Sequence, residues 1–181
     1  ALISAPYFVS EEIHMSEKSK VKINPTKFQK NLNAVCWILF LAFLGYSFFA
    51  WQHLPEMIPK HFNGAGVIDA YWSKNHFFFL PIMSAITYLT ISICEFFPQS
   101  WNIPQKKGAS LLQNEKNLSL AYSMVIWLKL ECLIVFWLLT HYTVICRNLP
   151  IFFLALTMLI IFATMGYYIY RMYRKTEGEK L

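Results

Sequence analysis

The hydrophobic pattern of the chain shows four long apolar runs separated by polar segments. A helix needs about 20 predominantly apolar residues to cross the roughly 30 Å hydrocarbon layer of a bilayer. Runs of this kind cover residues 34–51, 77–97, 120–145 and 150–170. Lipid satisfies no backbone polar groups, so only helices and closed barrels span it. The pattern therefore predicts an all-α polytopic membrane protein, a four-helix transmembrane bundle.

The ends of these runs carry residues typical of helix termini. Asn24 and Pro25 could supply the N-cap and first position of the first helix. Pro81 falls in the first turn of the second run, where a missing N–H costs little. The fourth run ends in tyrosines followed by Arg171 and Arg174, which is how a helix end meets the lipid headgroups.

Composition agrees with a membrane chain. Of 181 residues, 56% are hydrophobic and only 14% are charged, which is outside the usual range for a soluble domain. The net charge of +6 comes from basic residues spread along the predicted helix ends, which favours the lipid bilayer and not nucleic acid as the partner. The four cysteines lie in or beside the apolar runs without a CxxC pair, so neither a disulfide framework nor a thiolate zinc site is expected.

The distribution of Lys and Arg predicts the orientation of the bundle. Twelve of these residues lie before residue 34, in 98–119 and after residue 170, against three in the segments that connect the other helix ends, Lys60, Lys74 and Arg147. Positive charge is retained on the cytoplasmic side. We therefore expect both termini in the cytoplasm and the loop 52–76 outside, in a plasma membrane.

The runs divide the chain into five segments. Residues 1–14 precede Met15 and a lysine-rich leader, and we interpret them as a non-native extension. The predicted segments are a basic cytoplasmic tail (1–33), two transmembrane helices with the outer loop (34–97), a cytoplasmic linker (98–119), a second helix pair (120–170) and a cytoplasmic tail (171–181).

The outer loop has a sequence of its own, "HLPEMIPKHFNGAGVIDAYWSK" (53–74). Pro55 and Pro59 interrupt the helical pattern, and Asn63 with Gly64 and Gly66 offers a tight turn. The residues that follow are rich in β-favouring types. We therefore predict a small extracytoplasmic hairpin, with "IPKHFN" on one side and "DAYWSK" on the other.

These loop residues resemble domain-of-unknown-function family 1648. The residues that carry the resemblance are Leu54, Pro55, Ile58, Pro59, His61, Phe62, Asn63, Gly66, Asp69 and Lys74. The family includes bacterial membrane proteins of the SdpI immunity type. The resemblance implies a receptor in the bacterial plasma membrane that protects against a peptide toxin and sequesters a repressor. Such proteins carry a G-x-R-T type motif in a later loop, which this chain lacks, so what the resemblance implies here is a membrane module with an outward-facing loop.

Two interpretations of the polar loop residues stay open. His53, Glu56 and His61 could bind zinc, with Asp69 or His76 completing the ligand set. Alternatively, His61 and Asp69 could hydrogen-bond within the hairpin and hold it on the bundle.

Lys129 and Glu131 are charges well inside the third apolar run, where they are costly unless partnered. Two residues apart on a helix, they point to nearly opposite sides and do not neutralise each other. Lys129 could extend toward the cytoplasmic headgroups. We expect Glu131 to face the bundle interior. The candidate partners are Tyr88, Thr90, Tyr122, Thr157, Thr164 or a second subunit of a homo-oligomer.

The sequence favours a non-enzymatic receptor or immunity-type module whose outer loop recognises an extracytoplasmic ligand such as a peptide. The alternatives are a metal-binding membrane enzyme and a small transport component that uses Glu131. No nucleophile elbow, paired-carboxylate motif or HExxH accompanies the loop residues, which disfavours the enzyme. No cofactor is expected unless the loop histidines bind zinc.

Overall fold

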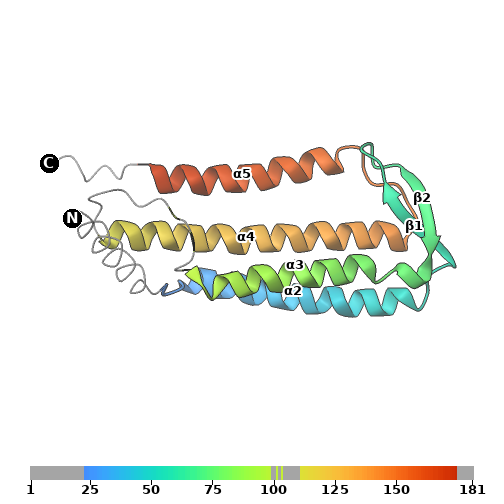
Figure 1. The fold of residues 1–181 in the computed structure, drawn as a ribbon, viewed down its shortest axis with the longest axis horizontal. Coiled ribbons are helices and arrows are strands. Elements are labelled where there is room, and N and C mark those ends of the chain that lie inside the picture. Colours follow the sequence, from blue (N-terminus) through green and yellow to red (C-terminus); the bar gives the residue numbers. More distant parts are fainter. Residues whose placement is uncertain (1–22, 99–100, 102, 104–110, 175–181) are drawn as a thin grey trace, which may run out of the picture.

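The computed structural model describes residues 23–98, 101, 103 and 111–174. Its elements follow one another as four helices with one hairpin between the first two (Figure 1). They are α2 (Lys27–Trp51), β1 (Met57–Phe62), β2 (Ile68–Ser73), the short 3-10 turn η1 (Lys74–His76), α3 (Phe79–Glu95), α4 (Leu111–Val144) and α5 (Phe153–Tyr173).

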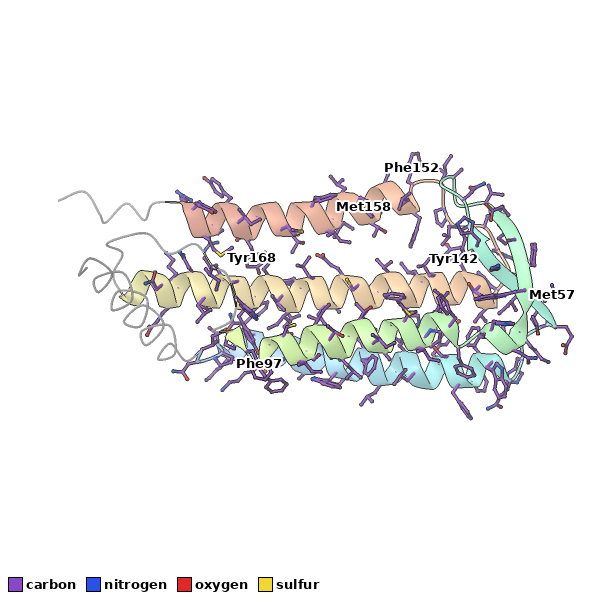
Figure 2. The ribbon with its side chains drawn as sticks, viewed as in Figure 1. Met57, Phe97, Tyr142, Phe152, Met158 and Tyr168 are labelled. Carbon is purple, nitrogen blue, oxygen red and sulfur yellow. The ribbon has the colours of Figure 1, made fainter. Side chains whose placement is uncertain are left out.

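The four helices run up and down along one long axis, with the hairpin across one end (Figure 1). α4 is the central helix, and α2, α3 and α5 each pack against it. In Figure 2, Met57 of the hairpin and Phe97 after α3 lie at opposite ends of the molecule. The start of α2 and the end of α5 share the end opposite the hairpin.

The core lies between α2, α3 and α4. It is built from Phe40 and Phe43 of α2, Tyr88 of α3, and Ile126 and Leu133 of α4. The rings of Phe40 and Tyr88 stack with centroids 4.2 Å apart. A second cluster of Ala50, Leu54, Ile58 and Phe77 seals the hairpin end. The hairpin is therefore attached to the bundle through apolar side chains.

All four predicted spans are present as helices. The ranges long and apolar enough to cross a membrane are Lys27–Trp51, Lys74–Glu95, Asn114–Val144 and Phe153–Tyr173. The apolar window of α5 has no buried residue, whereas those of the other three are partly buried. The protein is therefore a helical membrane protein in which α5 has the character of a lipid-facing helix.

The helix starts differ from the prediction: α3 and α5 begin two and three residues later than predicted, and α2 and α4 differ in ways that contacts explain. Thr26, and not Asn24, caps α2, through a capping box with Gln29. α4 begins at Leu111, nine residues before the predicted span, because a helix continues past the hydrocarbon layer where its polar turns find partners. One such partner is Gln29, whose amide nitrogen donates to the carbonyl oxygen of Ser119 at 2.9 Å.

Some predicted segments lie outside the described residues. They are the tail up to residue 22, with the proposed extension 1–14, the linker residues 99–100, 102 and 104–110, and the tail from residue 175.

Candidate ligand site beneath the hairpin

The loop forms the predicted antiparallel hairpin. Met57 pairs with Ser73, Ile58 with Trp72, and His61 with Ala70. The register shifts on both sides of His61, so that Lys60 bulges from β1 and Asp69 from β2. Bulges twist a ribbon and redirect its side chains. Here they bring His61 and Asp69 together.

The turn of the hairpin is shaped by Asn63 and Gly66. The side-chain oxygen of Asn63 accepts from the backbone N–H groups of Ala65 (3.0 Å) and Val67 (3.1 Å). Gly66 adopts φ +81°, a left-handed conformation that favours glycine. A Cβ at Gly66 would also lie 2.6 Å from the carbonyl oxygen of Leu149. Conformation and space therefore both require glycine at this position.

The turn docks on the segment that joins α4 to α5. The N–H of Leu149 donates to the carbonyl oxygen of Gly66 at 2.8 Å. The N–H of Ile68 donates to the side-chain oxygen of Asn148 at 2.9 Å. The hairpin, which follows α2, is thus tied to both later helices at their hairpin ends.

Two polar side-chain pairs brace the hairpin. His61 Nδ1 lies 2.7 Å from a carboxylate oxygen of Asp69, and the ammonium group of Lys74 lies 2.7 Å from Glu56. Both pairs are largely exposed, so each contributes less than about 1 kcal/mol. The first is the pairing proposed as the alternative to a zinc site.

The proposed zinc ligands are not brought together. The ring of His53 contacts the carbonyl oxygen of Phe49, Glu56 pairs with Lys74, and His61 pairs with Asp69. In the described part of the chain, no three His, Cys, Asp or Glu side chains form a group that could hold a metal. In the described residues His53, Glu56 and His61 are not assembled as one ligand set, because the prolines and the strand separate residues that are close in sequence.

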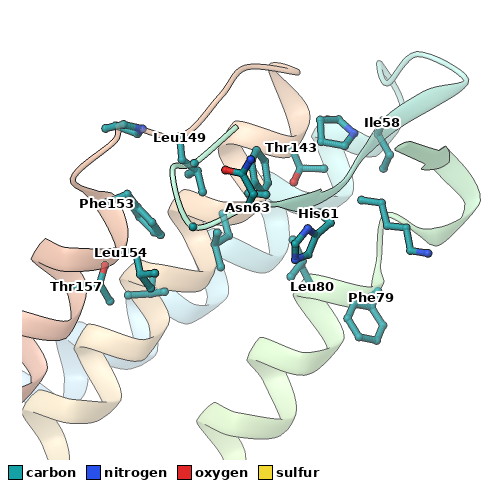
Figure 3. Close-up of a pocket in the computed structure, with 18 of the residues that line it drawn as sticks. Ile58, His61, Asn63, Phe79, Leu80, Thr143, Leu149, Phe153, Leu154 and Thr157 are labelled. Carbon is teal, nitrogen blue, oxygen red and sulfur yellow. The ribbon is translucent and has the colours of Figure 1, made fainter. Parts of the chain in front are cut away.

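A cavity of about 450 Å³ lies beneath the hairpin, among α3, α4 and α5. This volume falls within the roughly 300–1,000 Å³ of small-molecule pockets. In Figure 3, Ile58, His61 and Asn63 of the hairpin lie over Leu80 of α3 and Thr157 of α5. The wall is mostly apolar, and the polar groups lie at the hairpin rim. The remaining predicted loop residues are Pro59, which lines the cavity, and Pro55, which is exposed in the loop before β1.

Two buried polar atoms of residues that line this cavity have no hydrogen-bond partner among the described residues. They are the indole nitrogen of Trp72 and the hydroxyl oxygen of Thr143. The Thr143 residue is only 3% exposed. Buried polar groups are generally hydrogen-bonded. A donor pair left without partners on a cavity wall is typical of a site that a ligand completes.

Lys129 is the centre of a buried polar cluster near the other end of the bundle. Its ammonium nitrogen lies 2.6 Å from Oε1 of Glu95 and 2.6 Å from the side-chain oxygen of Asn33. The Asn33 amide also donates to Glu95 Oε2 at 3.1 Å. The hydroxyl oxygen of Ser92 accepts from the Lys129 ammonium group at 3.4 Å, and that ammonium group lies over the ring of Tyr88. Lys129 therefore does not extend to the headgroups, and Tyr88 is the predicted partner whose ring lies against its ammonium group.

Glu131 lies on another side of α4, toward α5. It is half-buried and accepts a hydrogen bond of 2.5 Å from Thr164, one of its predicted partners. Its second oxygen is buried without a hydrogen-bond partner among the described residues. The carboxylate faces a cleft between α4 and α5 that Trp127 and Tyr168 also line. The expectation that Glu131 faces the bundle interior stays a prediction; the structure places its carboxylate against Thr164 of α5.

Four residues of these sites were missed by sequence reasoning. Asn33 and Glu95 complete the Lys129 cluster, and Asn148 and Leu149 hold the hairpin turn. Glu95 carried a usable signal, because it is an acidic residue inside the apolar run 77–97 and Lys129, in another run, was expected to need a partner. Asn148 and Leu149 carried none.

The loop and the helices beside it are the part of the chain that a family model matches. Residues 38–85 match the family described as Domain of unknown function (DUF1648). This segment is similar to that family. It covers most of α2, the hairpin and the start of α3. The resemblance predicted from the loop residues is confirmed for about a quarter of the chain. No curated protein and no solved structure matches the chain significantly.

Proposed function

We propose that the protein is a bacterial plasma-membrane receptor, of immunity type, that binds an extracytoplasmic ligand in the cavity beneath the hairpin. The observation that carries this proposal is the cavity itself. It has an apolar wall and a polar rim, and two buried polar groups of its lining residues have no partner in the described part of the chain. Largely pre-formed apolar pockets with a few convergent polar groups are the usual form of ligand sites.

The orientation of the proposed receptor rests on charge. Lys27 and Lys30 at the start of α2 and Arg171 and Arg174 at the end of α5 lie at the end opposite the hairpin. Because positive residues are retained in the cytoplasm, that end is the cytoplasmic one in our proposal. The hairpin and its cavity then face the outside.

The connections of the hairpin support a receptor that transmits binding. The turn is bonded to Leu149 and Asn148, between α4 and α5, while its strands follow α2 and precede α3. A ligand under the hairpin would therefore contact elements attached to all four helices. α4 leads from this site to the Lys129 cluster, which joins three helices near the cytoplasmic end.

Labelling of single cysteines tests the proposed orientation. In a chain whose four native cysteines are replaced, Ala65→Cys lies on the exposed hairpin tip and Arg174→Cys at the exposed end of α5. A membrane-impermeant thiol reagent should label Ala65→Cys in intact cells, and Arg174→Cys only after permeabilisation. The reverse pattern would overturn the proposed function, because the cavity would then face the cytoplasm.

A further inference from the structure

We propose that the ligand of this cavity is an anionic lipid-type amphiphile, with its headgroup at Lys60 and Trp72 and its alkyl chain between α3, α4 and α5. The inference rests on the proposed function and names the chemical class of its ligand. Three features of the cavity carry it: the depth of the apolar wall, the charge of the rim, and the polar groups without partners.

The apolar wall extends well into the membrane-spanning part of the bundle. Val135 on α4 lies nine residues before the helix end at Val144, which corresponds to about 14 Å at 1.5 Å per residue. The wall also includes Leu139 on α4 and, in the first two turns of α5, Leu154, Thr157 and Met158. Thr157 has the only polar side chain among these five.

An alkyl chain fits this lower part better than a peptide does. A peptide would bring backbone N–H and C=O groups into hydrocarbon, where each group without a partner costs several kcal/mol. The hydroxyl of Thr157 could serve one of them. An alkyl chain has no polar groups that need a partner. When it moves from the bilayer into the cavity, its contacts with lipid are replaced by similar apolar contacts with the protein.

The rim carries one uncompensated cation. The ammonium group of Lys60 lies 5.9 Å from the centre of the Trp72 ring. In the described part of the chain, Lys74 and His61 are paired with Glu56 and Asp69, whereas no carboxylate forms an ion pair with Lys60. An anionic headgroup would complete the charge at this position.

The groups without partners among the described residues belong to Trp72 of β2 and to Thr143, one residue before the end of α4. The indole N–H of Trp72 is a donor, and the Thr143 hydroxyl both donates and accepts. The phosphate and ester oxygens of a lipid provide acceptors at this level, directly above the alkyl chain. The order of cation, donors and apolar wall thus matches the order of groups along an anionic lipid.

The arrangement of the helices provides a route from the bilayer. α3 and α5 each pack against α4 (Figure 1), and no extensive contact joins α3 to α5 within the described chain. The cavity lies in the angle between them. A lipid could therefore enter sideways without passing through water.

Native mass spectrometry of the full chain in a neutral detergent tests the proposal. The probes are phosphatidylglycerol and phosphatidylcholine with identical acyl chains. We expect one tightly retained phosphatidylglycerol, with about a tenfold preference over phosphatidylcholine, since one charge-assisted hydrogen bond is worth about a factor of ten. Equal retention of the two lipids would overturn the proposal.

Two variants and two matched controls locate the site. Lys60→Gln should abolish the preference, while Lys27→Gln, which removes an exposed lysine at the other end, should keep it. Thr157→Trp should fill the cavity and abolish retention. Leu156→Trp, at the exposed residue just before Thr157, should not. Lys60 is exposed, so its variant tests the proposal even if Thr157→Trp fails to fold.

The outcomes separate this proposal from the proposed function. Outside labelling of Ala65→Cys without a lipid preference would overturn the lipid ligand and leave a receptor for another class, such as a peptide. Labelling of Ala65→Cys from the cytoplasmic side would overturn the receptor whatever lipid is bound.

Discussion

The ammonium nitrogen of Lys129 lies 2.6 Å from the carboxylate oxygen Oε1 of Glu95, and this ion pair joins α4 to α3 inside the bundle. The side chains are 0% and 6% exposed, respectively. Asn33 of α2 contacts both partners, accepting from Lys129 and donating to Glu95. Charges in a membrane interior are expensive unless they are paired in this way. The three helices are therefore fixed relative to one another by a polar cluster as well as by aromatic packing.

Breaking this pair should destabilise the protein strongly. Lys129→Met leaves Glu95 buried without its cation, and Glu95→Met leaves Lys129 without its anion. Each change should lower the free energy of unfolding by about 3 kcal/mol. The double variant should recover much of this loss, because it leaves no unpaired charge. Thermal unfolding in detergent measures the stability of the two single variants and the double variant. A loss of stability in the double variant equal to the sum of the two single losses would contradict the pairing.

Glycine at position 66 should be irreplaceable, while the nearby Gly64 should tolerate change. Gly66→Ala puts a side chain at φ +81° and a Cβ 2.6 Å from the Leu149 carbonyl oxygen, so the hairpin should detach from the α4–α5 turn. A Cβ at Gly64 meets nothing within 4 Å. Protease sensitivity of the hairpin compares the two, and equal sensitivity of Gly66→Ala and Gly64→Ala would show that the docked turn is wrong.

Cys146→Gly should stabilise the protein. Cys146 adopts φ 49° just after α4. The N–H of Cys146 donates to the carbonyl oxygen of Thr143, and the N–H of Arg147 donates to the carbonyl oxygen of Tyr142. This is the Schellman pattern at a helix C-terminus. Glycine avoids the roughly 1 kcal/mol cost of this conformation. Cys146→Ala keeps that cost and is the control. The unfolding midpoint should rise for Cys146→Gly alone, and a fall would contradict the assigned geometry.

Chelation should leave the stability of the protein unchanged. His53, Glu56 and His61 are engaged with three different partners, so the hairpin holds itself together without a metal. We expect the same unfolding midpoint with and without chelator, and His61→Ala should cost less than about 1 kcal/mol because its pair with Asp69 is exposed. A stoichiometric transition metal that is lost from His61→Ala would show that the loop rearranges around it.

The spans and the hairpin were predictable because they depend on local patterns. Apolar runs of about 20 residues specify helices in a membrane whatever surrounds them. Pro59, Asn63 and Gly66 specify where a strand and a turn lie. The extended start of α4 was not predictable from hydropathy, because the residues before the apolar run are mostly polar and the contact seen there, from Gln29 to Ser119, comes from a distant helix.

The contacts between elements depend on how the helices pack, which periodicity does not reveal. Sequence reasoning identified Lys129 as needing a partner but did not single out Glu95, 34 residues earlier on another helix. The cavity depends similarly on the hairpin folding back over α4 and α5 through Gly66 and Leu149. Nothing in either segment alone indicates that they meet.

The cavity should be open to the outside, and labelling of Leu139→Cys tests this. Leu139 lines the cavity wall and is half-buried. In the chain without native cysteines, a small membrane-impermeant thiol reagent should modify Leu139→Cys in intact cells. Adding Thr157→Trp should slow the reaction strongly, while adding Leu156→Trp should leave its rate unchanged. Protection of Leu139→Cys in intact cells, with Ala65→Cys labelled normally beside it, would contradict a ligand cavity that opens to the outside.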